Sequence, residues 1–385
     1  MPESTDLVIA GAVILARFIL PLFIPKFPLP AIIVCLVLDG VDQTIFQQFT
    51  SFELNWYQSY DKALDIYYLV IAYLSTLRNW RNQWAFKISR FLIYYRLIGV
   101  VLFELLDIRA LLLVFPNTFE YFFIYYEAVR SRWNPLRFPD RMWTVAAAAI
   151  WIVIKLPQEW WIHIAQRDVT DTVKEVLFGV SADAPFGAAL ANRPWMVLVI
   201  LGVFVLLALA ARYLVIPRLP APHHNWQFAA EPLPRRAETP EGKRDLIMRQ
   251  GRLFNRILFE KIALVALVSI IFAQILPGYT GTGLQLAAGV ATIVTLNSAI
   301  SHWFAIKGFG WQSAVKQFFT LLAVNWAIAA TGNLLLGISL LGSGPSGFLL
   351  LLLTLLITLY DYFRPMYAAR FELRGKGGRK PAAAV

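Results

Sequence analysis

Two apolar stretches near the start of the chain contain acidic residues and decide how the rest is interpreted. Residues 31–43 read AIIVCLVLDGVDQ, and residues 60–77 read YDKALDIYYLVIAYLSTL. Their acidic residues are Asp39, Asp42, Asp61 and Asp65. Carboxylates are costly in hydrocarbon and usually face a protein interior or a water-filled path. The stretch from Pro28 to Leu77 is therefore the candidate functional centre.

The composition of the whole chain is typical of a membrane protein. Of its 385 residues 58% are hydrophobic and 15% are charged, and the mean hydropathy is +0.58, whereas soluble domains have roughly 25% charged residues. Apolar residues are consecutive rather than alternating, as in Met196 to Ala210, which indicates helices rather than a β-barrel. We predict an all-α, polytopic integral membrane protein.

The apolar runs predict about eleven transmembrane helices, given that roughly 20 residues cross a hydrocarbon core. The expected spans are Leu7–Phe23, Ala31–Phe46, Asp61–Leu77, Phe86–Leu106, Ala110–Tyr126, Thr144–Ile162, Trp195–Ile216, Ile257–Leu276, Thr282–Phe304, Phe318–Leu341 and Phe348–Phe363. The first two are short and rich in proline, and a re-entrant hairpin is the alternative for that pair. The first run carries Arg17 in its middle, which does not fit a secretory signal peptide.

Basic residues gather in alternate loops between the expected spans. One side holds the arginines and lysines of segments 78–90, 130–141 and 218–256, and the other holds Glu53 and the mildly acidic segment 167–193. Arginine and lysine are enriched in cytoplasmic loops. The pattern predicts a protein integral to the cell membrane, with its N-terminus outside and its C-terminus in the cytoplasm.

Composition divides the chain into four segments. We expect residues 1–216 to form an N-terminal transmembrane bundle that holds nearly all the buried charge. Residues 217–253 form a basic, proline-containing cytoplasmic linker, for which a solvated and partly disordered connection is expected. Residues 254–364 form apolar C-terminal transmembrane helices, and residues 365–385 form a basic cytoplasmic tail.

The net charge of +11 does not indicate nucleic acid, because the basic residues collect between spans, where they set topology. The expected partners are the lipid bilayer and anionic lipids at the basic cytoplasmic loops. The apolar C-terminal helices offer a surface for a membrane protein partner or a homo-oligomer. Cys35 is the only cysteine, which excludes an intrachain disulfide and a cysteine-based metal site.

The spacing of the four aspartates predicts that they act together. Asp39 and Asp42 are three residues apart, and Asp61 and Asp65 are four apart, so each pair shares one helix face. We expect the two pairs to converge and to bind a cation or a proton, because carboxylate oxygens suit hard cations. The alternatives are a first helical turn at the water interface for Asp61 and Asp65, and a structural hydrogen bond for Asp39.

Three further charges lie inside later spans, and we interpret them as balancing or gating charges. Arg96 and Glu120 lie at similar expected depths and are the obvious ion pair, since a single buried charge is costly. Lys155 either extends to the interface or pairs with Asp39 or Glu120. Pro116 and Asn117 break the helix just before Glu120, which is a second indication of a polar cavity.

Several motifs are missing from the sequence. It contains no G-x-x-x-x-G-K-[ST], no H-E-x-x-H and no G-x-S-x-G, which argues against ATP-driven transport by this chain alone, zincin chemistry and that type of serine hydrolase. The leading hypothesis is a transport protein whose carboxylates form a cation or proton site. The alternatives are a membrane-embedded enzyme acting on a lipid or isoprenoid, with an acidic group or carboxylate-bound Mg²⁺, and a non-catalytic subunit of a membrane complex.

Overall fold

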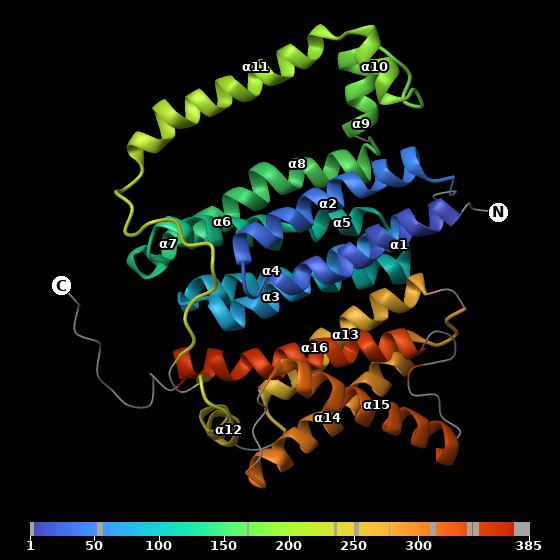
Figure 1. Ribbon diagram of the computed structural model, residues 1–385, viewed down its shortest axis with the longest axis vertical. Coiled ribbons are helices and arrows are strands. Elements are labelled where there is room, and N and C mark those ends of the chain that lie inside the picture. Colours follow the sequence, from blue (N-terminus) through green and yellow to red (C-terminus); the bar gives the residue numbers. More distant parts are fainter. Residues whose placement is uncertain are drawn as a thin grey trace.

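The computed structural model is built from helices that lie side by side. It describes residues 4–51, 57–167, 169–234, 237–249, 254–276, 278–308, 313–336, 341 and 346–372. Every element within these ranges is helical, as predicted. The long helices of the bundle run back and forth between the same two ends (Figure 1). The predicted tail falls largely on residues 373–385, which lie outside the described residues, as does Glu53.

The helices follow one another in two groups. The first group comprises α1 (Ser4–Ile19), α2 (Pro28–Phe49), α3 (Tyr57–Asn79), α4 (Gln83–Leu106), α5 (Ala110–Val114), α6 (Thr118–Arg132), α7 (Asp140–Ala149), α8 (Leu156–Glu159), α9 (Val169–Thr172), α10 (Phe186–Asn192) and α11 (Trp195–Ala210). The second comprises α12 (Pro240–Arg249), α13 (Arg256–Ile275), α14 (Gly283–Ile306), α15 (Ala314–Leu336) and α16 (Ser346–Tyr367). Short π-helical or 3₁₀ segments include η1 (Leu20–Phe23), η3 (Pro135–Arg137), η4 (Ile150–Lys155), η5 (Trp160–Ile164), η6 (Val173–Phe178), η7 (Ala211–Val215), η8 (Ile216–Arg218) and η10 (Ala368–Glu372).

Eight of the described helical stretches are long and apolar enough to cross a membrane. They are Thr5–Phe23, Pro28–Phe49, Asp140–Ile164, Trp195–Arg218, Arg256–Ile275, Gly283–Ile306, Ala314–Leu334 and Ser346–Phe371. These helices indicate an integral membrane protein in a lipid bilayer.

Three of the eleven expected spans are not among these eight. Two of them, Asp61–Leu77 and Phe86–Leu106, lie in the long helices α3 and α4, which carry several charged residues. The third, Ala110–Tyr126, is divided into α5 and α6 around Pro116. A proline lacks the N–H that would continue the helical ladder, so this break follows from the sequence.

Helix α3 is the centre of the molecule. It packs against α1, α2, α4 and α6 on one side and against α13 and α16 on the other. Every residue from Ile66 to Leu77 is buried. A helix that is covered on all faces needs no polar stripe, so the polar and charged groups of α3 face other parts of the protein.

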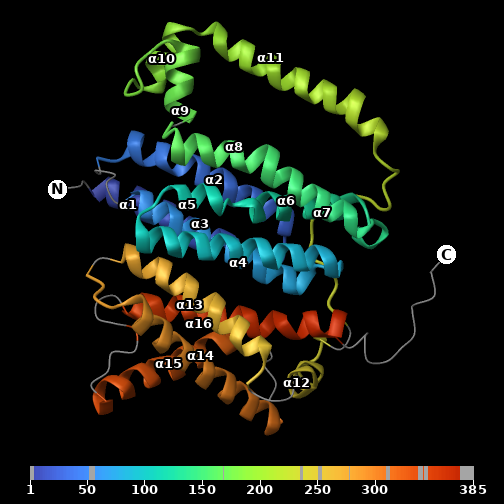
Figure 2. The ribbon, with the colours of Figure 1, turned by 180° about the vertical axis from the view of Figure 1, so that it is seen from behind.

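Two of the C-terminal helices contact α3 directly. Helices α13 and α16 pack on α3, and α14 and α15 lie beyond them (Figures 1 and 2). Inside the group, Asn297 of α14 donates to Asn325 of α15 at 2.5 Å, and Asn325 donates to Thr354 of α16 at 2.8 Å. Hydrogen bonds between side chains on neighbouring helices stabilise packing in lipid.

Helix α11 has a different environment. In both views it lies apart from the bundle, to which α9 and α10 connect it (Figures 1 and 2). In the most apolar 18-residue stretch of Trp195–Arg218, no residue is buried. Leu198 and Leu206 are 71% and 67% exposed, so α11 presents apolar side chains on every face and is suited to surrounding lipid.

The part of the linker that the structure describes is largely exposed to solvent, and it follows a defined path over the protein. Residues 219–234, called the strap below, lie against one end of the N-terminal bundle (Figure 1). The backbone N–H of His223 donates to the carbonyl of Arg132 at 3.0 Å, and that of Ala230 donates to the carbonyl of Lys26 at 2.8 Å. These backbone hydrogen bonds fix the strap at these two points, while most of its side chains remain exposed. Arg235 and Arg236 lie outside the described residues.

Candidate functional site

Helix α2 places two of the aspartates deep inside the bundle. Prolines occupy its first turn, where a missing N–H costs nothing, and the helix continues to Phe49. Asp39 is the twelfth of its 22 residues, which is roughly 16 Å from the helix start at a rise of about 1.5 Å per residue. Asp42 lies one turn further along and is fully buried. Both carboxylates therefore lie within the membrane-crossing part of α2.

The structure brings all four predicted aspartates together around Arg17 of α1. We call this group (Arg17, Asp39, Asp42, Asp61 and Asp65) the aspartate–arginine cluster. One terminal nitrogen, Nη1, donates to Asp42 and, at 2.9 Å, to Asp61. The other, Nη2, donates to Asp39 and, at 3.0 Å, to Asp65. The four N–H groups at the two tips of the guanidinium thus serve four different carboxylates from two helices.

Burial divides the cluster into a closed pair and an open group. The Arg17 and Asp42 side chains are 3% and 0% exposed. The Tyr57 hydroxyl closes this pair from the other side by donating to Asp42 at 2.5 Å. Asp39, Asp61 and Asp65 keep 21%, 31% and 21% of their side-chain surface exposed. The three open carboxylates are therefore accessible, whereas the pair behind them is not.

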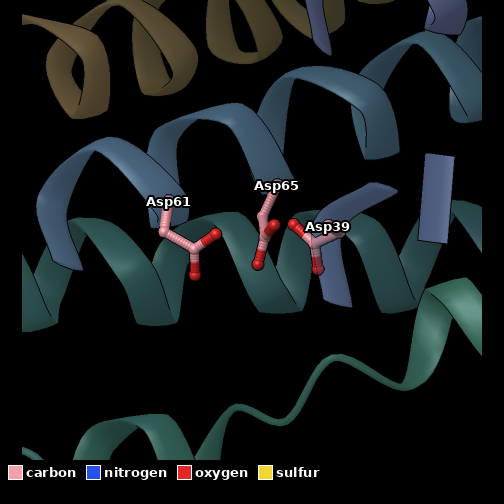
Figure 3. Close-up of side chains that lie close together, drawn as sticks. All are labelled: Asp39, Asp61 and Asp65. Carbon is pink, nitrogen blue, oxygen red and sulfur yellow. The ribbon is translucent and has the colours of Figure 1, made fainter. Parts of the chain in front are cut away.

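The three open carboxylates face one another. Figure 3 shows the Asp39 and Asp65 carboxyl groups pointing toward each other and Asp61 one turn away on the same helix as Asp65. One oxygen from each of the three lies within 4.8 Å of the others, which is a spacing that can hold a metal ion. Asp39 and Asp65 are within hydrogen-bonding reach of each other. Arg17 Nη2 compensates part of the repulsion between these two carboxylates, and a shared proton or a bound cation would remove the rest.

The charge balance of the cluster favours the binding of protons or cations. If every group were ionised, the four aspartates and Arg17 would leave three negative charges. A net charge of this size is costly in a region of low dielectric constant. Bound protons or cations remove it. The chemistry available here is therefore reversible binding of protons or of a hard cation through carboxylate oxygens.

A second buried polar group surrounds Glu120 at the start of α6. Its carboxylate accepts from the Tyr68 hydroxyl and, at 3.1 Å, from the Asn117 side-chain amide. Lys155 is the nearest cation, with its Nζ 3.8 Å from Glu120 and the same distance from the centre of the Tyr121 ring. Glu120 and Lys155 are each 4% exposed. The pair is isolated from bulk water.

The local backbone explains how these groups meet. The break at Pro116 leaves the Asn117 N–H without a helical acceptor, and it donates to Glu159 at 3.1 Å. Lys155 ends the π-helical segment η4, two residues before Pro157. A proline inside a helix removes one backbone donor, and wide helical turns of this kind are frequent at functional sites. Two proline-induced irregularities thus face each other across the Glu120–Lys155 pair.

The structure corrects one predicted pairing and selects among alternatives for another. Arg96 and Glu120 do not form the expected direct ion pair, because the Arg96 guanidinium donates at 3.0 Å to the carbonyl of Phe115 in the helix break. Lys155 pairs with Glu120, one of the two counter-charges considered for it, and does not extend to the interface. Arg96 still contributes positive charge near Glu120. It acts on the group through space rather than by contact.

Helix α3 connects the two polar groups. Asp65 belongs to the aspartate–arginine cluster and Tyr68 to the Glu120 group, and the two residues are three apart on one helix face. Glu120 is close enough for its charge to act on Asp39 and Asp65. A change of protonation or ligand occupancy in one group therefore alters the electrostatic potential in the other.

The chain matches no known family. Comparisons with protein-family models, with curated proteins and with solved structures found no match. The site must be interpreted from its own geometry.

Sequence reasoning identified the four aspartates but missed the residues that organise them. Arg17 was visible as a charge within an apolar run, and a buried cation of this kind requires nearby anions. Tyr57 and Tyr68 were not distinguishable from the many other tyrosines, because only the packing of α3 aims their hydroxyls at carboxylates.

Proposed function

We propose that this protein is a membrane transport protein in which Asp39, Asp61 and Asp65 form a cation site coupled to protons. One observation carries the proposal: three partly exposed carboxylates lie within 4.8 Å of one another, on α2 and on the central helix α3, in front of the closed Arg17–Asp42 pair. Intramembrane acids in such a setting are typical of ion and proton pathways.

The charge of the cluster suggests how binding and release are linked. Arg17 compensates Asp42, so the open carboxylates need up to three positive charges from outside. A cation and protons compete for the same oxygens, because a protonated carboxyl is a poor cation ligand. Binding of the cation therefore releases protons, and protonation releases the cation. This exchange is the basis for coupling the two across a membrane.

Arg17 has a positioning role in this proposal. Its guanidinium holds one oxygen of each aspartate in place, so the remaining oxygens keep their geometry when the ligand leaves. A planar, permanently charged fork suits this task better than a lysine, which is a flexible point charge.

The Glu120 group serves as the balancing charge. Glu120 and Lys155 form a buried pair with no net charge, and Arg96 adds a positive charge nearby. Loss of negative charge at Asp39 and Asp65 weakens the repulsion on Glu120. We propose that this electrostatic link sets the relative stability of two conformations of the transporter, with the break at Pro116 as the flexible point.

We also propose the complete topology. Helices α3, α4 and the α5–α6 pair cross the membrane in addition to the eight apolar stretches, which gives about eleven crossings. Their polar residues face the protein interior, as the burial of α3 indicates. Lys26 and Arg81 lie against the strap, since Ala230 donates to the Lys26 carbonyl and Glu231 lies 3.8 Å from Arg81. The end where the strap lies is assigned to the cytoplasm, and the N-terminus to the outside of the cell membrane.

A flux assay tests the proposed function. The purified protein is reconstituted into liposomes that contain a pH-sensitive dye, and inward gradients of Na⁺, K⁺, Mg²⁺ or Ca²⁺ are imposed in turn. We expect at least one cation to drive a change of internal pH. Asp39→Asn and Asp65→Asn should abolish it. The matched control is Asp107→Asn, which removes an exposed carboxylate at the left-handed end of α4, where asparagine is tolerated.

The proposal fails if none of these cations moves protons, or if the Asp39→Asn protein works as well as the wild type. A fold defect is separated from a site defect by size-exclusion chromatography and by the unfolding temperature of each variant before reconstitution.

The same three carboxylates favour a second candidate, a membrane-embedded enzyme that binds a divalent metal and acts on a lipid or isoprenoid. Oxygen ligands from three aspartates suit Mg²⁺ or Mn²⁺, and a bound metal can stabilise negative charge on a phosphate group. Cation-dependent thermal stabilisation that is lost in Asp39→Asn, combined with no ion flux, would favour the enzyme over the transporter.

A further inference from the structure

A pocket lies at the end of the molecule opposite the N-terminus, between the strap and the end of α16. Its cavity volume is about 260 Å³. The residues that line it are Arg81, Glu231, Pro232, Pro234, Ala369, Arg370 and Phe371. They come from three separate parts of the chain: the turn between α3 and α4, the strap and η10. The pocket exists only because the strap is ordered against the bundle.

Two guanidinium groups contribute to the pocket wall from opposite sides. Arg370 donates to the carbonyl of Trp80 at 3.4 Å and to that of Pro232 at 3.1 Å. These contacts fix its position without neutralising its charge. Arg81 is 46% exposed and lies 3.8 Å from the Glu231 carboxylate, which is longer than a hydrogen bond. Both side chains keep donors for a further partner.

The charges around the pocket do not balance. Of the residues that the structure describes, Arg81 and Arg370 are the positive groups of the lining, and Arg78 and Arg130 lie behind it. The negative groups within ion-pair distance of these arginines are Glu127 and Glu231. Glu127 is committed to Arg130 at 2.5 Å. Among the described residues, Arg78 and Arg370 have carbonyl and amide oxygens as partners but no carboxylate. The lining therefore carries one positive charge in excess, and Arg78 behind it adds a second.

We propose that this pocket binds a phosphate group, carried either by a lipid headgroup or by a small soluble molecule. Guanidinium groups form charge-assisted, often bidentate hydrogen bonds to phosphate oxygens. The two lining arginines outnumber the single lining carboxylate, and Arg78 behind the wall adds a further positive charge, so the pocket favours an anion such as phosphate. Pro232, Pro234 and Phe371 reduce the access of water on the remaining sides, which strengthens these hydrogen bonds. The site is independent of the transport proposal.

Binding at this place has a structural consequence. The ligand contacts the N-terminal group through Arg81 and the C-terminal group through Arg370, whose guanidinium also donates to the Pro232 carbonyl of the strap. A phosphate group therefore links the two helical groups and holds the strap in place. Because it binds the folded arrangement only, it also stabilises the protein.

Glu231 gives the site a charge that competes with the ligand. It is the only acid among the lining residues, and its carboxylate is shared between Arg81 at 3.8 Å and Arg130 at 3.7 Å. Replacing it by glutamine keeps the shape and removes the repulsion of an incoming anion. This substitution should strengthen phosphate binding, a gain that misfolding would not produce.

The test uses the full chain, purified in an uncharged detergent, and titration calorimetry with inorganic phosphate and pyrophosphate. In parallel, the protein is placed in nanodiscs of phosphatidylcholine alone or with phosphatidylglycerol, and retained lipid is identified by mass spectrometry. We expect Arg81→Gln and Arg370→Gln to weaken binding about tenfold or more, the typical effect of losing one charge-assisted hydrogen bond. Arg137→Gln, an exposed arginine at the same end, is the control and should bind as the wild type does.

Titration with phosphate and retention of phosphatidylglycerol separate a soluble ligand from a lipid. The proposal is overturned if the wild type binds neither, if the Arg81→Gln/Arg370→Gln double variant binds as well as the wild type, or if Glu231→Gln binds no more tightly.

Discussion

Arg17 of α1 and Asp42 of α2 form an ion pair that is almost completely buried, with side-chain exposures of 3% and 0%. Three more aspartates approach the same guanidinium from α2 and α3. The pair therefore ties the first three helices together at the point where the proposed cation site opens. Its integrity should control both stability and binding.

Replacing Arg17 by glutamine removes the only guanidinium from the cluster and leaves a buried Asp42 without its counter-charge. Breaking a buried ion pair on one side costs about 3–5 kcal/mol. We expect a loss of stability of this size, measured by chemical unfolding in detergent. Arg109→Gln, at an exposed position, is the control. A change of less than about 0.5 kcal/mol for Arg17→Gln would contradict the arrangement.

The ion pair between Arg17 and Asp42 also predicts a coupling free energy between substitutions at the two positions, which a general loss of stability would not produce. Asp42→Asn removes the carboxylate that Arg17→Gln leaves unpaired, so the double variant should be more stable than the sum of the two single changes predicts. Residues in direct contact usually show a coupling energy of about 0.5–3 kcal/mol. The same unfolding measurement on all four proteins gives this energy. Strict additivity would mean that the two side chains do not interact.

Tyr57 is expected to matter through its hydroxyl alone. The hydroxyl donates to Asp42 at 2.5 Å, and a hydrogen bond to a charged group contributes about 1.5–3 kcal/mol. Tyr57→Phe should lose stability of that order while the ring keeps its contact with Phe46. Tyr125→Phe, on a partly buried ring packed against Trp143, serves as the comparison and should change stability little. Equal effects of the two substitutions would contradict a specific role for the Tyr57 hydroxyl.

The aspartate pairs could be predicted from the sequence because the spacing of residues along a helix decides which side chains share a face. Asp39 and Asp42 share a face at any helix rotation, as do Asp61 and Asp65, and helix spacing alone determines this. The break before Glu120 was also local, since Pro116 cannot continue a helix. The meeting of α2 with α3 required only that two consecutive helices pack together.

Other features depended on which helices become neighbours. Arg17 reaches the aspartates only because α1 packs beside both α2 and α3. Glu120 pairs with Lys155 rather than Arg96 because the break at Pro116 offers Arg96 a carbonyl. The strap is held by backbone hydrogen bonds and by arginine and tryptophan side chains that donate to its carbonyls. These contacts come from distant parts of the chain and leave no signature in the composition of the segment, which was expected to be a partly disordered connection.

The Glu120–Lys155 pair should behave as a unit. Glu120→Gln leaves a buried ammonium group, and Lys155→Met leaves a buried carboxylate, so each single change should cost about 3–5 kcal/mol. The double variant has no unpaired charge and should lose much less than either. Unfolding of the three variants and the wild type provides the test. A double variant that is less stable than both singles would show that the charges are not paired.

The order of the strap can be tested by cross-linking, because the chain has a single cysteine. Cys35 is buried and can be replaced by alanine, which leaves a background free of thiols. The Ala230 N–H donates to the Lys26 carbonyl at 2.8 Å, which brings the two backbones within the range of a disulfide. Lys26→Cys/Ala230→Cys should therefore form an intrachain disulfide under mild oxidation, detected by mass spectrometry of non-reduced peptides. Lys26→Cys/Ala221→Cys joins the same turn to an exposed strap position that lies nine residues earlier, and it should cross-link far more slowly. A solvated linker would give similar rates for both pairs, because flexible loops of different length close with similar probability, so equal rates would contradict the ordered strap.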